Sequence, residues 1–205
     1  GLLAKKLPQK TILPTLKTYN LMPTPQPFLP RGGSYKNLIA YQKAECVYDV
    51  TFYFAHHYLE KSDRTIDQMV QAARSGKQNI AEGAAAGNTS KETEIKLTNV
   101  AKASLQELLV DYEDFLRVRG LEQWQPDDAR LAQTKRACAA HNDSEYYRKA
   151  MPERSAETIA NIAITLIHQT DWLLNKLIEK LEIQFVENGG VKEQMTKARK
   201  EYRGY

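Results

Sequence analysis

One helical stretch, residues 63–86, constrains the fold of this chain more than any other segment. On a helical wheel its larger apolar side chains share one face, which is the pattern of a helix packed on a core. They are Ile66, Met69, Val70, Ala73, Ile80 and Ala84. Ala72, Gly76, Asn79 and Gly83 form a second stripe of small residues, and glycine inside a helix costs about 1 kcal/mol relative to alanine. We therefore predict close packing between neighbouring helices through a motif of Ala72, Gly76, Asn79, Glu82 and Gly83.

Three further segments have the length and periodicity of long helices. They span about residues 35–59, 91–118 and 152–185, and no strand pattern or internal repeat accompanies them. Thr89-Ser90-Lys91-Glu92 predicts a capping box at the start of the third helix. Gly87 or Asn88 is expected to end the second helix in the left-handed conformation. The sequence therefore predicts an all-α fold with four long helices and short appendages.

The chain divides into three regions. Residues 1–33 read as a proline-rich extended arm, either solvated or docked on a neighbouring surface. Residues 34–186 hold the long helices, interrupted by a helical insertion at 121–151, and residues 187–205 predict a short amphipathic helix with a basic tail.

Charge and apolar content bound the class of protein. The net charge is +4, but residues 37–186 hold 18 basic and 22 acidic residues, so the positive excess lies in the tails and weakens a nucleic-acid interpretation. There is no apolar run of membrane-spanning length and no secretory signal core. The two cysteines, Cys46 and Cys138, are too few for a disulfide framework. We expect a cytoplasmic protein.

The first long helix carries a second apolar stripe of Val47, Val50, Phe54 and Tyr58. An apolar face this wide leaves two interpretations open. Either the helix is deeply embedded, or the second stripe meets another subunit.

No pattern of catalytic or metal-binding residues stands out. The histidines and cysteines lack the spacings of a metal site, and no nucleophile motif frames a serine. We therefore predict no enzyme activity, no cofactor and no metal. A modest basic patch on the second and third helices is a candidate nucleic-acid site, although an ordinary solvated face explains it equally simply. It consists of Arg74, Lys77, Lys91, Lys96 and Lys102.

Several strings together resemble a known family. They are Tyr41-Gln42-Lys43-Ala44, Gln71-Ala72-Ala73-Arg74-Ser75, Asn79-Ile80-Ala81-Glu82-Gly83 and Thr89-Ser90-Lys91-Glu92. The resemblance is to the four-helix-bundle proteins encoded in intervening sequences of bacterial large-subunit ribosomal RNA genes, also labelled ribosomal-protein-like. It covers about residues 36–119 and the fourth long helix. The insertion and the extra C-terminal helix look like the subgroup with a four-helix-bundle "suffix" region.

The resemblance implies an up-and-down bundle that self-associates, often as a pentameric ring. A similar fold serves as the accessory protein of diversity-generating retroelements, which binds a reverse transcriptase and nucleic acid. Two features depart from the family pattern. Lys77 stands where members often have proline, and the insertion at 121–151 exceeds their usual connection.

These observations predict a non-enzymatic, oligomeric helical-bundle adaptor that binds RNA or DNA through the basic patch. The alternative is an oligomeric scaffold with protein partners only. We predict no membrane partner and no small-molecule substrate.

Overall fold

The computed structural model describes residues 34–204, and all regular secondary structure in this part of the chain is helical, with no strand. The long helices are α1 (Ile39–Tyr58), α2 (Thr65–Ala86), α3 (Lys91–Val118) and α6 (Ala156–Asn188). The shorter elements are η1 (Tyr35–Asn37), α4 (Ala129–Ala140), α5 (Ser144–Ala150), η2 (Met151–Glu153) and α7 (Val191–Arg203). The prediction of an all-α fold is confirmed. The predicted arm at 1–33 lies outside the described residues.

Two long helices begin later than the sequence predicted. The backbone is extended at Leu38, with ψ of 121°, so Tyr35–Asn37 forms a separate 3-10 turn before α1. Before α6, Pro152 falls within the 3-10 turn η2. The helix itself is capped by Ser155, whose side chain accepts a hydrogen bond from the Thr158 N–H at 3.2 Å.

The turn between α2 and α3 corrects two local predictions. Ser90 is the N-cap of α3 and accepts a hydrogen bond from the Thr93 N–H at 3.1 Å, while Glu92 pairs with a lysine one turn on instead of closing a capping box. Gly87 is right-handed with φ of −58°, and no non-glycine residue in 34–204 has positive φ. The Glu94 carboxylate packs against Gly87, in the space that a Cβ at this position would occupy.

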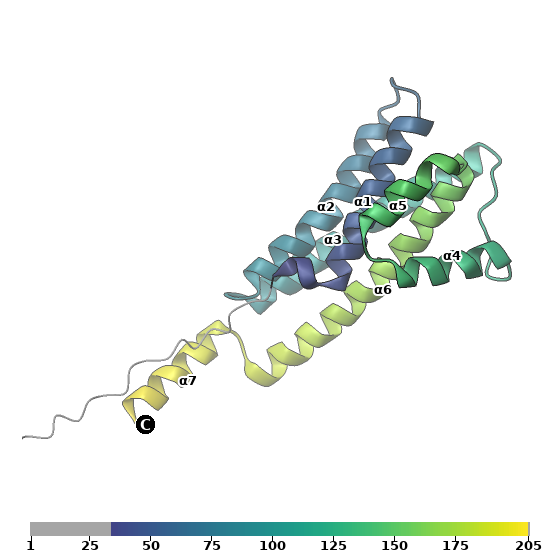
Figure 1. The fold of residues 1–205 in the computed structure, drawn as a ribbon. Coiled ribbons are helices and arrows are strands. Elements are labelled where there is room, and N and C mark those ends of the chain that lie inside the picture. The colour runs from purple at the N-terminus through teal and green to yellow at the C-terminus, as the bar shows by residue number, and fades with distance from the viewer. Residues whose placement is uncertain (1–33, 205) are drawn as a thin grey trace, which may run out of the picture.

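Each of the four long helices packs against two of the others. α2 contacts α1 and α3, and α6 also contacts α1 and α3 (Figure 1). The direction of the α3–α6 pair follows from its hydrogen bonds: Lys102 bonds Asn175, and one turn further along α3, Gln106 bonds Asp171, one turn earlier in α6.

The core between α1 and α3 centres on Tyr112. This side chain is fully buried, and its hydroxyl donates a hydrogen bond to Thr51 Oγ1 at 3.0 Å. The ring of Phe54 lies 5.0 Å from that of Tyr112 and 4.7 Å from that of Phe115 between centroids. Burial raises the pKa of Tyr112, so the phenol stays protonated as a donor.

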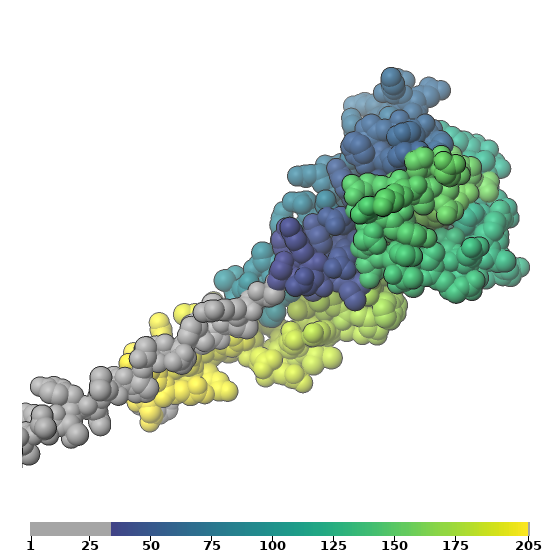
Figure 2. Space-filling view, in the orientation of Figure 1, coloured from purple at the N-terminus to yellow at the C-terminus, as the bar shows by residue number. Residues whose placement is uncertain are grey.

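The insertion and the C-terminal helices extend the molecule in different ways. α4 and α5 form a layer on one side, where α4 packs on α6 and α5 packs on α1 (Figure 2). α6 has 33 residues and is about 50 Å long, yet its buried side chains end at Leu181. α7 buries no side chain and points away from the long helices (Figure 1).

Gly76 sets the closeness of α2 and α3, and its replacement tests that packing. A Cβ at this position would lie 2.7 Å from Leu105 Cδ2, inside a fully buried region. We expect Gly76→Ala to lower the free energy of unfolding by about 1–2 kcal/mol, because overpacking outweighs the better helix propensity of alanine. Denaturant unfolding measures it.

The control is a double-mutant cycle with Leu105→Ala. If the clash is the cause, the two changes together cost less than their sum. A Gly76→Ala protein as stable as the unmodified chain, or strictly additive effects, would show that the glycine is not needed for close approach.

Candidate functional site

The residues of the predicted basic patch are mostly engaged within the protein. Lys91 pairs with Glu94 at 2.8 Å, and Lys96 pairs with Glu92 at 2.7 Å. Each of these charges is therefore compensated locally.

The rest of the patch is divided. Lys102 hydrogen-bonds Asn175 of α6, and the Lys77 amine lies 4.3 Å from the centroid of the Tyr48 ring. Arg74 is exposed and forms no ion pair within residues 34–204. The structure thus places these residues along α2 and α3 but leaves only part of their charge uncompensated.

An acidic groove of about 640 Å³ lies between α2 and α3, on the C-terminal side of the α3 lysines. Asp67, Glu107 and Asp111 line it. Partial burial, together with Asp114 and Glu107 nearby, raises the pKa of Asp111. A carboxylate cluster of this kind repels a phosphate backbone, so the α2–α3 surface does not present one continuous positive field.

The predicted packing motif lies at the α2–α3 contact in part. Ala72, Gly76 and Gly83 are buried, whereas Glu82 is exposed. Asn79 stays within its own helix, where its amide donates to the Ser75 carbonyl at 2.9 Å.

The polar bond across this contact comes instead from two serines. Ser75 Oγ and Ser104 Oγ of α3 are 2.9 Å apart. The amide of Asn79 reaches the same Ser75 hydroxyl at 3.2 Å.

The second apolar stripe of α1, one interpretation of which was an oligomer interface, is largely buried within the chain. Val47, Val50 and Phe54 have exposures of 0%, and Tyr58 is half-buried with its hydroxyl donating to the Arg154 carbonyl at 2.7 Å. Two elements pack on α1, namely α5 of the insertion and the long helix α6. Of the two interpretations of this stripe, the structure favours a first helix that is deeply embedded in its own chain.

The cysteines are buried thiols. Burial raises the pKa of Cys46 to about 12, which keeps it protonated and unreactive near neutral pH. Within residues 34–204, no group of three or more His, Cys, Asp or Glu side chains is placed to hold a metal ion.

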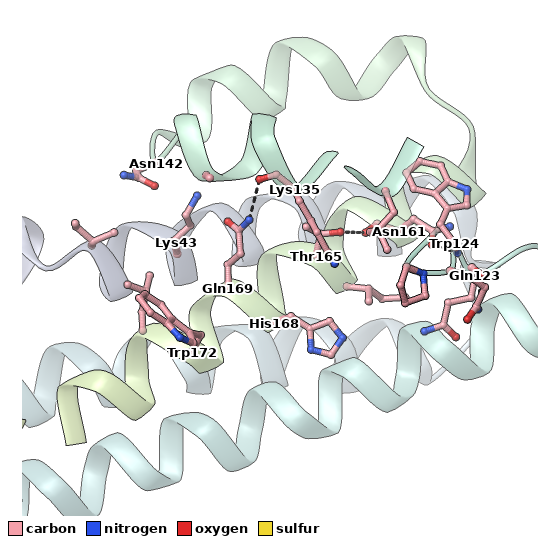
Figure 3. Close-up of a pocket in the computed structure, with 17 residues that line it drawn as sticks. Lys43, Gln123, Trp124, Lys135, Asn142, Asn161, Thr165, His168, Gln169 and Trp172 are labelled. Atoms are coloured by element: carbon pink, nitrogen blue, oxygen red, sulfur yellow. Dashed lines mark hydrogen bonds between the residues drawn. The ribbon is translucent and has the colours of Figure 1, made fainter. Parts of the chain in front are cut away.

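A pocket that sequence reasoning missed lies beneath the insertion. Its volume is about 690 Å³, and it is enclosed by α4, α6, the start of α1 and the loop that follows α3 (Figure 3). The principal apolar side chains in its lining are Trp124, Leu131, Ile164, Trp172 and Leu173. Its size lies in the range of small-molecule sites, about 300–1,000 Å³.

Asn161 holds the loop that closes one end of this pocket. Its side chain is 2% exposed; its Oδ1 accepts from the Trp124 N–H at 2.9 Å, and its Nδ2 donates to the Glu122 carbonyl at 2.9 Å. One carboxamide on α6 therefore satisfies two backbone groups of the loop. Thr165 donates to the Asn161 carbonyl at 2.8 Å within α6.

Arg130 fastens the outer side of the same loop. Its guanidinium is 2.7 Å from Glu122 and 2.6 Å from Asp128, and it lies 5.1 Å from the centroid of the Trp124 ring. These carboxylates raise the pKa of Arg130. Trp124 is thus held by α6 through its backbone N–H and by α4 through its ring.

Lys43 of α1 joins the pocket to the end of α4. Its side chain is buried at 3% exposure, and its amine donates to the carbonyls of Cys138 and His141, the latter at 3.0 Å. These carbonyls belong to the C-terminal end of α4, where a cation is favoured. Burial lowers the pKa of Lys43.

Three polar atoms of the pocket lining lack a hydrogen-bond partner. They are Trp124 Nε1, Asn142 Oδ1 and Gln169 Oε1. Among residues 34–204, these three are the buried side-chain nitrogen and oxygen atoms that have no hydrogen-bond partner. Leaving such an atom buried and unpaired costs about 1–3 kcal/mol.

No sequence signal pointed to this pocket, since its residues come from four separate segments. Comparison of the chain with protein family models, with characterised proteins and with solved structures finds no match. The resemblance stated from the sequence therefore stays a prediction. Among the helices of residues 34–204, none combines the length and apolar composition needed to cross a bilayer.

Proposed function

We propose that this chain is an up-and-down four-helix-bundle protein that self-associates and acts as a non-enzymatic adaptor. The antiparallel contacts of α1, α2, α3 and α6 support the bundle. The association surface that we propose differs from the one expected on α1.

The observation that carries the proposal is an apolar surface at the C-terminal end, which we name the α6–α7 surface. Ile183 is 58% exposed, Phe185 39%, Val186 83% and Met195 38%. Large apolar side chains gathered at one end of a molecule mark an interaction site. Burying one such side chain contributes about 1.5–3 kcal/mol.

Charge complementarity supports a second copy of this chain as the partner. α7 carries five basic and two acidic residues, whereas the groove between α2 and α3 is lined by acidic side chains. One copy therefore offers a basic amphipathic helix and an acidic groove, and head-to-tail contacts between them can close into a ring.

Light scattering coupled to size-exclusion chromatography tests the association. At tens of micromolar protein we expect a mass that is a multiple of 23.4 kDa. Val186→Glu should shift the protein toward the monomer, because it places a charge in the proposed contact. Val118→Glu is the matched control, since Val118 is 69% exposed at the far end of α3.

An unmodified chain that elutes as a monomer at this concentration contradicts the proposal. If the Val186→Glu and unmodified proteins assemble to the same mass, the interface does not lie on the α6–α7 surface.

Binding of RNA or DNA is the second candidate. Arg74 supports it, because its guanidinium is exposed and has no ion-pair partner in the described chain. Repeating this charge around a ring would concentrate positive potential.

A gel shift with single-stranded RNA at low and moderate salt tests this candidate. We expect affinity to fall steeply with salt, and Arg74→Glu to weaken binding more than Lys91→Glu or Lys102→Glu, because those two lysines already have partners. Lys61→Glu, on the turn before α2, is a control with the same change in charge. If the assembled protein does not retard RNA at low salt, only the adaptor with protein partners is left.

A further inference from the structure

The pocket under the insertion has the features of a built binding site for a small molecule. Trp124 and Trp172 stand at opposite ends of the lining, with Gln169 between them (Figure 3). Apolar walls of this kind bind the flat body of an organic ligand.

Unpaired polar atoms add a requirement for hydrogen bonds. Trp124 is only 8% exposed, yet its indole N–H has no acceptor. Gln169 donates its amide to the Lys135 carbonyl at 3.0 Å, which fixes Oε1 as an acceptor without a donor. A ligand that supplies an N–H or O–H donor would satisfy Gln169 Oε1 and recover the cost of leaving that atom unpaired.

The charged residues of the lining select the charge of the ligand. They are Lys43 and Lys135, and no aspartate or glutamate is among the lining residues. The Lys43 amine has three N–H groups, of which two bond the end of α4. Lys135 is exposed on the α4 wall, with no ion pair in the described chain. An acidic group therefore meets attraction here and no repelling carboxylate.

We propose that this pocket binds a small amphipathic anion: a flat apolar body that carries an acidic group and an N–H or O–H donor. The site is separate from the α6–α7 surface and from Arg74. It also revises the expectation that the chain has no small-molecule ligand.

The chain supplies its own reporter for this proposal. It contains two tryptophans, and both line the pocket. The probe is 8-anilinonaphthalene-1-sulfonate, which has an aromatic body, a sulfonate and an anilino N–H. We expect saturable binding of one probe per chain, with tryptophan fluorescence falling as energy passes to the probe.

N-phenyl-1-naphthylamine has the same body without the sulfonate and isolates the contribution of charge. We expect it to bind roughly tenfold more weakly. Lys135→Glu should reduce the affinity for the sulfonate and leave that for the neutral probe nearly unchanged. Lys61→Glu makes the same change in net charge outside the pocket and should leave both affinities as they are.

Two further variants locate the bound probe. Ala139→Phe, on the α4 wall, should block both probes by filling the pocket, with circular dichroism confirming that the helices remain. Val186→Glu should not affect binding.

Two results would overturn the proposal. Binding that survives Ala139→Phe but disappears in Val186→Glu would place the probe on the α6–α7 surface. If the two probes bind with equal affinity and Lys135→Glu changes neither affinity, the pocket does not select a ligand with an acidic group.

Discussion

A buried lysine amine connects the two parts of this molecule. Removing an ammonium group from water is costly unless hydrogen bonds replace the solvent. Lys43 of α1 meets this condition only because α4 ends beside it, so that the carbonyls of Cys138 and His141 accept from its amine. The contact also satisfies α4, since the last carbonyls of a helix lack donors within the helix. Docking of the insertion on the long helices therefore depends on this contact.

Much else follows once the insertion is docked. α5 packs on one side of α1, and Val47, Val50 and Phe54 of that helix lie in the core of one chain. α4 and the loop bound by Asn161 lie over α6, and together these elements line the pocket. Apolar side chains that remain exposed include Ile183, Phe185 and Val186 of α6, beyond Leu181, and Met195 of α7.

The sequence predicted the helices well, because apolar periodicity and the residues that begin or end a helix are local signals. The stripe around Gly76 and the glycine break at 189–190 are examples. It failed where partners come from distant segments. α5 against α1, Asn161 against the loop after α3, and Lys43 against the end of α4 are tertiary contacts with no local signature. The pocket depends on such contacts, so composition and spacing did not reveal it.

Lys43 holds the insertion in place, and native-state hydrogen exchange of the Lys43→Met variant tests this role most directly. Methionine keeps the apolar stem but removes the donor from the Cys138 carbonyl, and it leaves the His141 carbonyl with the Tyr147 hydroxyl alone. The account predicts that amides of α4 lose protection by about tenfold or more, while those at the α2–α3 contact keep theirs and Lys135→Met changes neither. Unchanged protection in α4, or an equal loss throughout the chain, would contradict it.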